Sequence, residues 1–170
     1  MTQRCYCVTE HNQPLVLMHN AVPEPAGGEV LVRITGAGVC HSDIHIWEGY
    51  FDLGGGKKLS VKDRGMKLPL TMGHEIAGEI VKAGPAAKAA KIGAKVVVYP
   101  WLGCGECATC RRGDENICTK PRAIGVAQPG GFAEYVLVPD AKYCVDIGGL
   151  DAQAAAPLAC SGVTTYSALK

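Results

Sequence analysis

Four of the nine cysteines lie close together in the stretch GCGECATCRRGDENIC, which runs from Gly103 to Cys118. Cys104, Cys107, Cys110 and Cys118 follow the spacing C-x2-C-x2-C-x7-C. Four thiolates at short spacing suit a tetrahedral ion with no open coordination position, which is a structural zinc site. The alternatives are an iron–sulfur cluster, whose bacterial run has a shorter last gap, and a group of reduced redox thiols. The spacing favours zinc.

Three further residues could form a second metal site of a different kind. Cys40 begins the stretch CHSDIH, His74 lies in GHE, and Cys160 lies in LACSG. Two cysteines and one histidine can bind zinc and leave its fourth position to water or substrate. The alternative for each residue alone is structural, because buried cysteines often pack as small apolar side chains and buried histidines are often hydrogen-bonded. Their long separation in sequence leaves both interpretations open.

The residues after Cys40 could carry a proton away from such a site. Zinc held by two thiolates and a neutral imidazole can polarise an alcohol oxygen and lower its pKa, as it does for bound water. Ser42 offers a hydroxyl next to the ion, and His45 offers an imidazole whose ordinary pKa suits a proton shuttle. The structural alternative is that Ser42 caps a helix starting after Cys40, with His45 solvated in its first turn.

The elements that must position these residues are mostly predicted strands. Many short β-type runs bounded by glycine and proline indicate a barrel or sandwich. The segment 73–84, GHEIAGEIVKAG, is ambiguous, and 54–67 is the most loop-like part and is expected at the surface. The strand-like runs cover residues 28–39, 94–100 and 131–147.

Only the last segment, residues 151–170, has a helical pattern. It starts at a possible N-cap, Asp151, and is divided by Pro157. Cys5, Cys7 and Cys144 match no ligand position. Cys5 and Cys7 should point to the same side of a strand, and all three are expected to be reduced and inert.

Composition restricts the class of protein. The chain has 170 residues, enough for one domain with a real core, and a net charge of +1 with 19% charged residues. Nucleic acid is therefore not the expected partner. The start lacks a secretory signal pattern and no apolar run approaches the roughly 18 residues that span a bilayer, so we predict a soluble cytoplasmic protein without a membrane partner.

The motifs together resemble a known family. GAGVCHSDIH, LPLTMGHEIAGEIV, GCGECATCRRGDENIC, GGFAEYVLVP and PLACSGVTTYSAL occur in the order found in zinc-dependent alcohol dehydrogenases of the medium-chain dehydrogenase/reductase family. The resemblance covers nearly the whole chain and is strongest to the tetrameric bacterial and archaeal-type enzymes. It implies a mostly β (α+β) fold, a GroES-like, partly open barrel with a zinc-stapled lobe.

The resemblance also implies two zinc ions per chain. Cys40, His74 and Cys160 correspond to the ligands of the catalytic zinc, and the four clustered cysteines to those of the structural zinc. Glu75 corresponds to a carboxylate that can approach the metal or briefly replace its water. Asp43 corresponds to a carboxylate that orients the ligands.

The remaining correspondences concern substrate and cofactor. Ser42 matches the hydroxyl that accepts the proton of the alcohol, and His45 the outer end of the relay to solvent. His41 matches the position that contacts the pyrophosphate of NAD or NADP. Trp47 and Trp101 lie where the family's substrate pocket has bulky side chains, although either could be a core residue.

The sequence shows no nucleotide-binding domain, since no strand is followed by G-x-G-x-x-G at the start of a helix. We therefore expect an N-terminal catalytic portion, residues 1–150 including a lobe at about 101–120, followed by residues 151–170 as the start of a connection. On this hypothesis the parent is a homotetramer or homodimer that oxidises a primary or secondary alcohol to an aldehyde or ketone. This portion alone should be inactive.

Two other classes remain as alternatives. A GroES-like assembly or binding module could use zinc for stability only, because a fold alone does not determine a function. Such a module has no need for CHSDIH together with His74 and Cys160. A zinc-ribbon nucleic-acid binder is disfavoured by the near-neutral charge and by the 6% content of aromatic residues.

Overall fold

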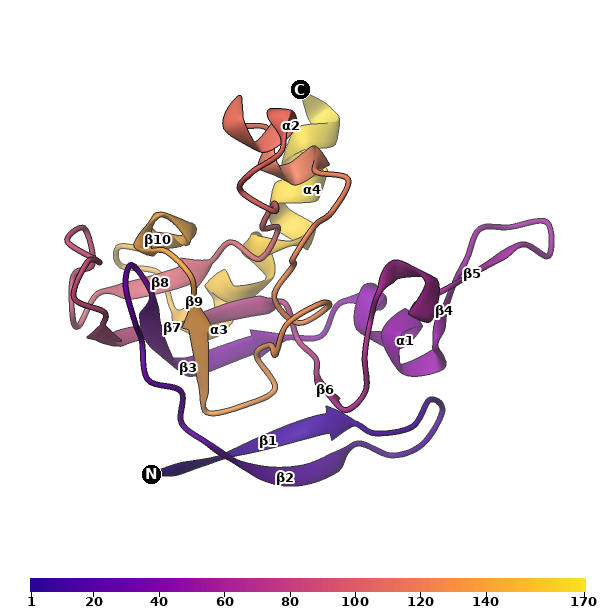
Figure 1. Ribbon diagram of the computed structural model, residues 1–170, viewed down its shortest axis with the longest axis horizontal. Helices are drawn as coiled ribbons and strands as arrows, with labels where there is room; N and C mark the ends of the chain where they lie inside the picture. The colour runs from indigo at the N-terminus through magenta and orange to yellow at the C-terminus, as the bar shows by residue number, and fades with distance from the viewer.

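A computed structural model describes residues 1–170, with the exception of the side chain of Arg64. The strands form three sheets (Figure 1). The strands are β1 (Thr2–Val8), β2 (Val16–Ala21), β3 (Val30–Gly38), β4 (Tyr50–Asp52), β5 (Lys58–Ser60), β6 (Leu70–Thr71), β7 (Glu75–Ala83), β8 (Lys95–Val98), β9 (Tyr135–Val138) and β10 (Cys144–Asp146). The helices are α1 (His41–Glu48), α2 (Ala108–Arg111), α3 (Ala152–Ala155), α4 (Ser161–Leu169) and the 3-10 turns η1 (Lys62–Arg64), η2 (Glu115–Ile117), η3 (Ala141–Tyr143) and η4 (Ala156–Ala159).

The largest sheet is antiparallel, with five strands in the order β10-β8-β7-β3-β9. Branched side chains fit its pleated surface, and Val30, Val32, Ile76, Val98 and Val138 are completely buried in its core. The pairing of β3 with β7 shifts register twice, and β3 ends at Gly38, two residues before Cys40. The core thus fixes the point from which the first candidate ligand projects.

A second sheet has the order β2-β1-β6. Along β1, Gln3, Cys5 and Cys7 are buried and alternate with exposed residues, which confirms that both cysteines point to one side of a strand. The Tyr6 N–H donates to Phe132 O at 2.8 Å, and Arg4 pairs with the carboxylate of Glu134. The first strand is therefore tied to a segment about 130 positions later in the chain.

Most expected elements are present, with three differences. The ambiguous segment 73–84 contains a long strand, β7. The run 131–147 is interrupted by η3 and gives two short strands, β9 and β10. The surface-loop prediction for 54–67 is wrong in part, because the segment contains β5 and η1 and buries Val61 and Met66 in a second apolar cluster.

The C-terminal segment is helical, as predicted. Asp151 is the N-cap of α3, and its carboxylate accepts from the backbone N–H groups of Gln153 and Ala154 at 2.9 and 3.1 Å. Pro157 lies in η4, which separates α3 from α4. No helix in the part of the chain that the structure describes is long and apolar enough to cross a membrane.

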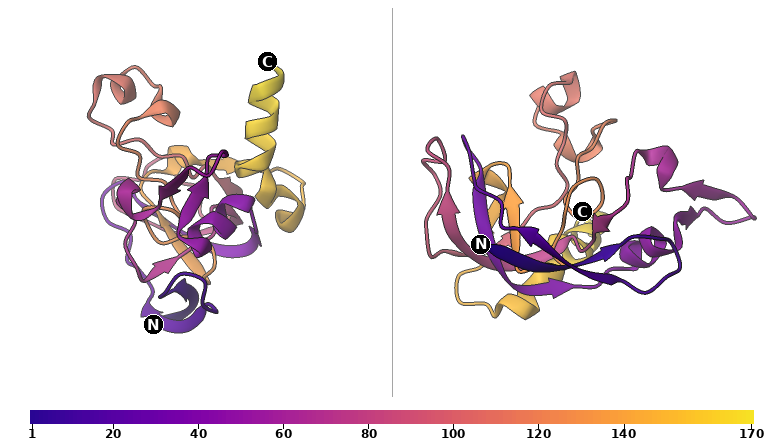
Figure 2. Two further views of the ribbon diagram at one scale, coloured as in Figure 1. Left: turned by 90° about the vertical axis from the view of Figure 1, so that its right-hand side faces the viewer. Right: turned by 60° about the horizontal axis from the view of Figure 1, so that its bottom comes forward.

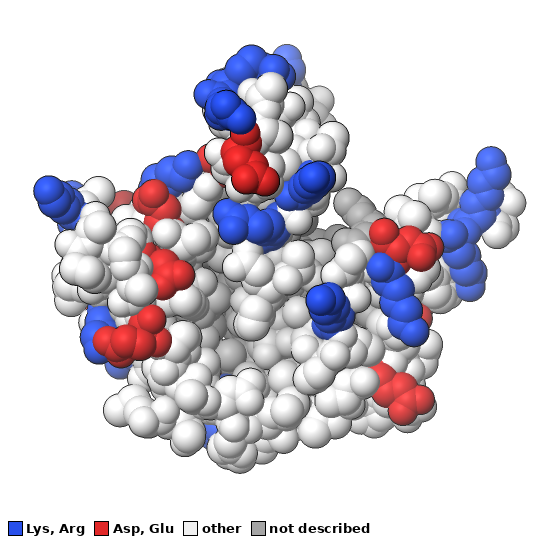
Figure 3. Space-filling view, viewed as in Figure 1, with Lys and Arg blue, Asp and Glu red and all other residues white. Residues whose placement is uncertain are grey.

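Three parts project from the body. The cysteine-rich lobe, residues 103–118, and α4 rise on the same side, and Figure 2 shows that they stand apart from each other. The β4–β5 hairpin forms an arm in a different direction. On the face shown in Figure 3, positive side chains on the lobe and the arm are interspersed with negative ones, in keeping with the net charge of +1.

Candidate functional site

Cys40, His74 and Cys160 converge although they come from three distant segments. Cys40 follows β3 and is the N-cap of α1, His74 precedes β7, and Cys160 lies between η4 and α4. Their ligand atoms all lie within 4.8 Å of one another, and the two sulfur atoms are 3.8 Å apart. The structure thus brings together the three residues that the sequence singled out.

Asp43 connects this group to the backbone on both sides. Its Oδ2 accepts from the Cys40 N–H at 2.9 Å, and its Oδ1 accepts from the Gly73 N–H at 3.2 Å. The same Oδ1 lies 3.4 Å from His74 Nδ1. Because Asp43 is 1% exposed, its carboxylate is fixed and holds the N-terminus of α1 against the segment that carries His74.

His74 has the surroundings expected of a metal ligand. Its side chain is completely buried, and apart from the 3.4 Å contact between Nδ1 and Asp43 Oδ1 neither ring nitrogen makes a hydrogen bond within the described part of the chain. Leaving a buried polar atom without a partner costs free energy, so such atoms call for a ligand or an ion. An imidazole nitrogen beside two sulfur atoms is a donor set that suits zinc, and the residues therefore fit this ion.

The two thiols of this group differ in their tendency to ionise. Burial opposes ionisation of Cys40, but the Ser42 N–H and the His74 ring outweigh it, so the pKa of Cys40 lies below its ordinary value. Burial, together with the charge of Cys40, raises the pKa of Cys160 to about 12. A cation between the sulfur atoms would favour the thiolate form of both.

Glu75 lies next to the group and is buried. Its Oε1 accepts from the Ser161 N–H at 3.2 Å, directly after Cys160. A Cβ atom on Gly38 would lie 2.2 Å from Glu75 Oε2, so glycine at this position makes room for the carboxylate. The carboxylate links the end of β3 to the start of α4.

Helix α1 presents the residues that follow Cys40. It begins at His41, and its N-cap is Cys40, so Ser42 lies in the first turn and is not the cap. His41 is exposed, and its ring contacts that of His45 with a centroid distance of 4.7 Å and a tilt of 46° between the ring planes. His45 Nδ1 lies 3.6 Å from a carboxylate oxygen of Glu48. One face of α1 thus leads from Ser42 to the surface.

A cavity of about 340 Å³ opens between α1, the arm and the lobe. Ser42 and Trp101 line it, and the Trp101 ring packs 5.4 Å from the His74 ring. Trp47 is not part of this lining; its indole N–H donates to Gln13 O at 2.7 Å. Sequence reasoning missed the apolar walls, since no motif distinguishes them from core residues: Ile46, Phe51, Val61, Met66 and Val126.

The lobe brings the four clustered cysteines together. Adjacent sulfur atoms are 3.5 to 3.9 Å apart, too far for disulfide bonds. A tetrahedron with metal–sulfur distances of about 2.3 Å has edges of about 3.8 Å, so the four sulfur atoms fit one zinc ion. Backbone N–H groups point at three of them, as suits thiolates: Cys104, Cys107 and Cys118.

Glu115 attaches the lobe to the body. Its carboxylate accepts from the Gly103 N–H, from Lys142 Nζ at 2.7 Å and from the Tyr143 hydroxyl. Lys142 and Tyr143 belong to η3, next to β10. These bonds, Lys142 first, hold the pKa of Glu115 below its usual value.

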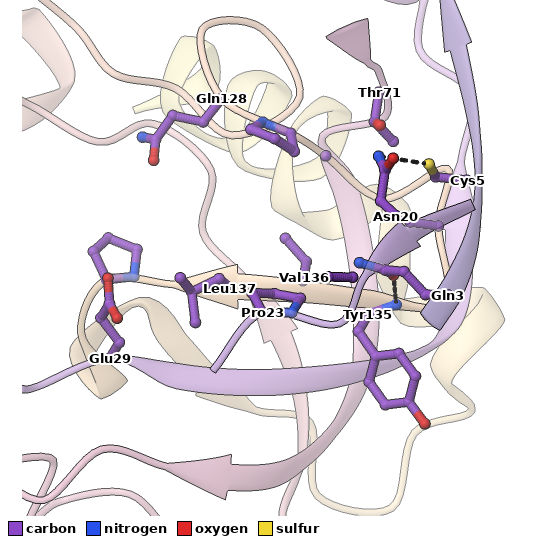
Figure 4. A pocket seen from close by; sticks show the side chains of 15 residues that line it. Gln3, Cys5, Asn20, Pro23, Glu29, Thr71, Gln128, Tyr135, Val136 and Leu137 are labelled. Carbon is purple, nitrogen blue, oxygen red and sulfur yellow. Dashed lines mark hydrogen bonds between the residues drawn. The ribbon is translucent and has the colours of Figure 1, made fainter. Parts of the chain in front are cut away.

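A separate cavity of about 270 Å³ lies between the β1–β2 hairpin and β9 (Figure 4). Gln3, Asn20 and Tyr135 line it, and Asn20 Nδ2 donates to Cys5 Sγ at 3.2 Å. None of the residues that converge in the two metal centres belongs to this lining. This cavity is therefore separate from both metal centres.

The sequence profile of a family described as the alcohol dehydrogenase GroES-like domain matches residues 26–149. The chain belongs to this alcohol dehydrogenase GroES-like domain family. The strand-rich α+β fold confirms the predicted class, and the solved relatives match this GroES-like domain over only part of their own length.

Similar proteins are dehydrogenases about twice as long. An NAD-dependent alcohol dehydrogenase of Saccharolobus solfataricus is 45% identical over 167 residues, 98% of this GroES-like chain and 47% of the relative. The D-arabinose dehydrogenase of Sulfolobus solfataricus superposes with a TM-score of 0.84 at 37% identity, covering 99% and 47% of the two chains. A thermostable alcohol dehydrogenase from Pyrobaculum aerophilum, with cobalt and zinc bound, has a TM-score of 0.80 at 31% identity over 98% and 47%. The chain thus spans about half the length of these relatives.

Proposed function

We propose that the chain is the zinc-binding catalytic part of a dehydrogenase. The reaction is transfer of hydride from a primary or secondary alcohol to NAD or NADP, which gives an aldehyde or ketone. One observation carries the proposal: the thiols of Cys40 and Cys160 converge on the buried imidazole of His74, which makes no hydrogen bond among the described residues, and Ser42 lines a nearby cavity. Relatives named NAD-dependent alcohol dehydrogenases support the acceptor.

The proposal gives a task to each residue of the metal group and to the residues around it. Cys40, His74 and Cys160 would hold the zinc ion, which supplies a Lewis acid that lowers the pKa of an alcohol. Asp43 keeps the ligands oriented through Cys40, and Glu75 stays close to the ligand set. Ser42 takes the proton of the alcohol and passes it along α1 to His45, which releases it to solvent.

The walls of the cavity favour an apolar alcohol over a sugar. Most of the walls of this cavity of about 340 Å³ are aromatic and aliphatic, and the polar side chains among them are Ser42, Asn116 and Cys118. A polyol would bury hydroxyl groups without partners, which costs free energy for each group. A D-arabinose dehydrogenase is among the structurally similar proteins. The polarity of the cavity walls therefore distinguishes apolar alcohols from sugars as the proposed substrates.

We propose that most of the NAD- or NADP-binding site lies in a part of the protein outside this chain. The chain covers 47% of the first relatives, and we propose that residues 1–150, with the lobe at about 101–120, work together with a nucleotide-binding half. Residues 151–170 would begin the connection, and His41, exposed at the start of α1, would contact the pyrophosphate. The lobe cysteines Cys104, Cys107, Cys110 and Cys118 would hold a second, structural zinc.

We further propose a cytoplasmic homotetramer or homodimer. None of the nine cysteines forms a disulfide in the structure, which fits a reducing compartment. Light scattering of the full-length protein gives its mass, and a monomer would contradict the oligomer.

The test is the zinc content of the full-length protein together with alcohol-dependent reduction of NAD. We expect two zinc ions per chain, falling to one in the Cys40→Ser, His74→Ala variant, and loss of benzyl alcohol oxidation. The matched control, Cys144→Ser with His19→Ala, changes the same residue types outside both centres and should keep both ions and the activity. Two ions in both variants, or higher activity with D-arabinose than with benzyl alcohol, would contradict the proposal.

A further inference from the structure

The turn between β1 and β2 closes the C-terminal end of α1. The last four carbonyl groups of an α-helix have no partner inside the helix. In α1 the first of them, His45 O, accepts from the Gly49 N–H at 2.9 Å. The turn supplies partners for the other three: His11 Nδ1 to Ile46 O at 3.2 Å, Asn12 N–H to Trp47 O at 2.9 Å, and Asn12 Nδ2 to Glu48 O at 3.2 Å.

Two backbone features fit this contact. Asn12 has φ of 60°, the one positive φ of a non-glycine residue among those that the structure describes, and asparagine tolerates this conformation better than most. Gly49 has φ of 90°, and a Cβ atom there would lie 2.8 Å from the His11 ring. The backbone conformation of the turn at Asn12 and that of the helix end at Gly49 therefore both permit this close contact.

The same hairpin also holds the segment that carries His74. β1 pairs with β6 through Cys7 and Thr71 and through Val8 and Leu70, and β6 ends three residues before His74. Val8 of β1, Ile46 of α1 and Leu70 of β6 lie in one buried cluster. The hairpin therefore packs against α1, which follows Cys40, and against β6, which precedes His74.

We propose that the β1–β2 turn is a positioning element for the metal centre, with His11 and Asn12 as its key residues. This inference rests on the proposed function. α1 has only eight residues, and a helix this short is marginal unless its ends are held. Asp43 fixes its first turn, and the hairpin turn fixes its last. His11 and Asn12 touch neither cavity nor ligands, and they act by holding α1, with Cys40, Ser42 and His45, in register with His74.

The test uses the full-length protein loaded with cobalt, whose absorption reports the ligand geometry. In the His11→Ala, Asn12→Gly variant we expect a shifted cobalt spectrum at the Cys40 centre and about tenfold weaker cobalt binding there. The spectrum and the cobalt affinity of the lobe centre should not change. We also expect kcat to fall by about tenfold to a hundredfold with little change in KM, because a small misplacement affects the reacting geometry. The control His19→Ala, on the same hairpin but away from α1, should leave all of these unchanged.

Milder variants keep the test valid if the double variant does not fold. Asn12→Gly retains the left-handed backbone and the N–H bond and loses only the bond to Glu48, so it should show a smaller shift. His11→Gln keeps a donor for Ile46 O and should restore most of the kcat lost in His11→Ala. An unchanged cobalt spectrum in a folded double variant, or equal changes at both centres, would overturn the inference. Absence of alcohol oxidation in the unmodified protein would overturn the proposed function, while the cobalt spectra would still report on the positioning.

Discussion

The two metal centres of this chain are built in opposite ways. The lobe draws its four cysteines from residues 104–118, and its sulfur atoms receive hydrogen bonds from neighbouring backbone. The other centre draws Cys40, His74 and Cys160 from three segments and depends on Asp43 and on the N-terminal hairpin for alignment. A local centre is specified by spacing, whereas a distributed centre is specified by the whole fold.

The largest effect should follow from removing one lobe thiolate. Cys107→Ser leaves three thiolates, and we expect loss of one zinc ion and a fall in the stability of the lobe on the order of 5 kcal/mol, because metal binding and folding are coupled. Zinc analysis and hydrogen exchange of residues 103–118 measure it. The centre at Cys40 should keep its ion, and loss of both ions would show that the two centres are not independent.

Asp43→Asn should weaken only the distributed centre. The substitution removes the charge that faces His74 and weakens the bond from the Cys40 N–H, so zinc affinity should fall by about 10- to 100-fold. Competition with a chelator measures the affinity of each centre. Asp63→Asn, on an exposed turn, is the control, and equal weakening at the lobe would contradict the assignment.

Gly38→Ala tests how closely the distributed centre is packed. The new Cβ would lie 2.2 Å from Glu75 Oε2, and we expect a loss of about 1–3 kcal/mol in unfolding free energy as the carboxylate is displaced. Gly28→Ala, where the nearest atom is 3.9 Å away, should change stability by less than about 0.5 kcal/mol. Denaturant unfolding measures the unfolding free energy of both variants. Equal values for Gly38→Ala and Gly28→Ala would contradict the close packing around Gly38.

Glu115→Gln should have the smallest effect and should concern the attachment of the lobe. It weakens the bonds to Lys142 and Tyr143, and we expect about 1 kcal/mol less stability with both zinc ions retained. Glu106→Gln, on the exposed side of the lobe, is the matched control. A thermal melt of the zinc-loaded protein measures both, and equal melting temperatures would show that the lobe is held in another way.

Sequence patterns predicted the local features well. The lobe spacing, the strand β3 and the N-cap Asp151 depend on neighbouring residues and were visible in the sequence. The interruption of 131–147 and the burial of Val61 and Met66 were not, because tertiary packing determines them. Convergence of Cys40, His74 and Cys160 was expected from the family resemblance alone. The capping of α1 by His11 and Asn12 had no sequence signal, since histidine and asparagine in a turn are common on any surface.

The tie between β1 and the segment 132–135 has a consequence for the order of folding. β1 is synthesised well before its partners Phe132 and Glu134, which follow more than 120 positions later. Contacts over such sequence distances form slowly, because a long loop must close before they contribute. We therefore expect the lobe to become ordered before the N-terminal hairpin, so that alignment of Cys40 with His74 is a late event. Pulse-labelling hydrogen exchange would show it as late protection of residues 2–8, and protection of β1 before the lobe would reverse this order.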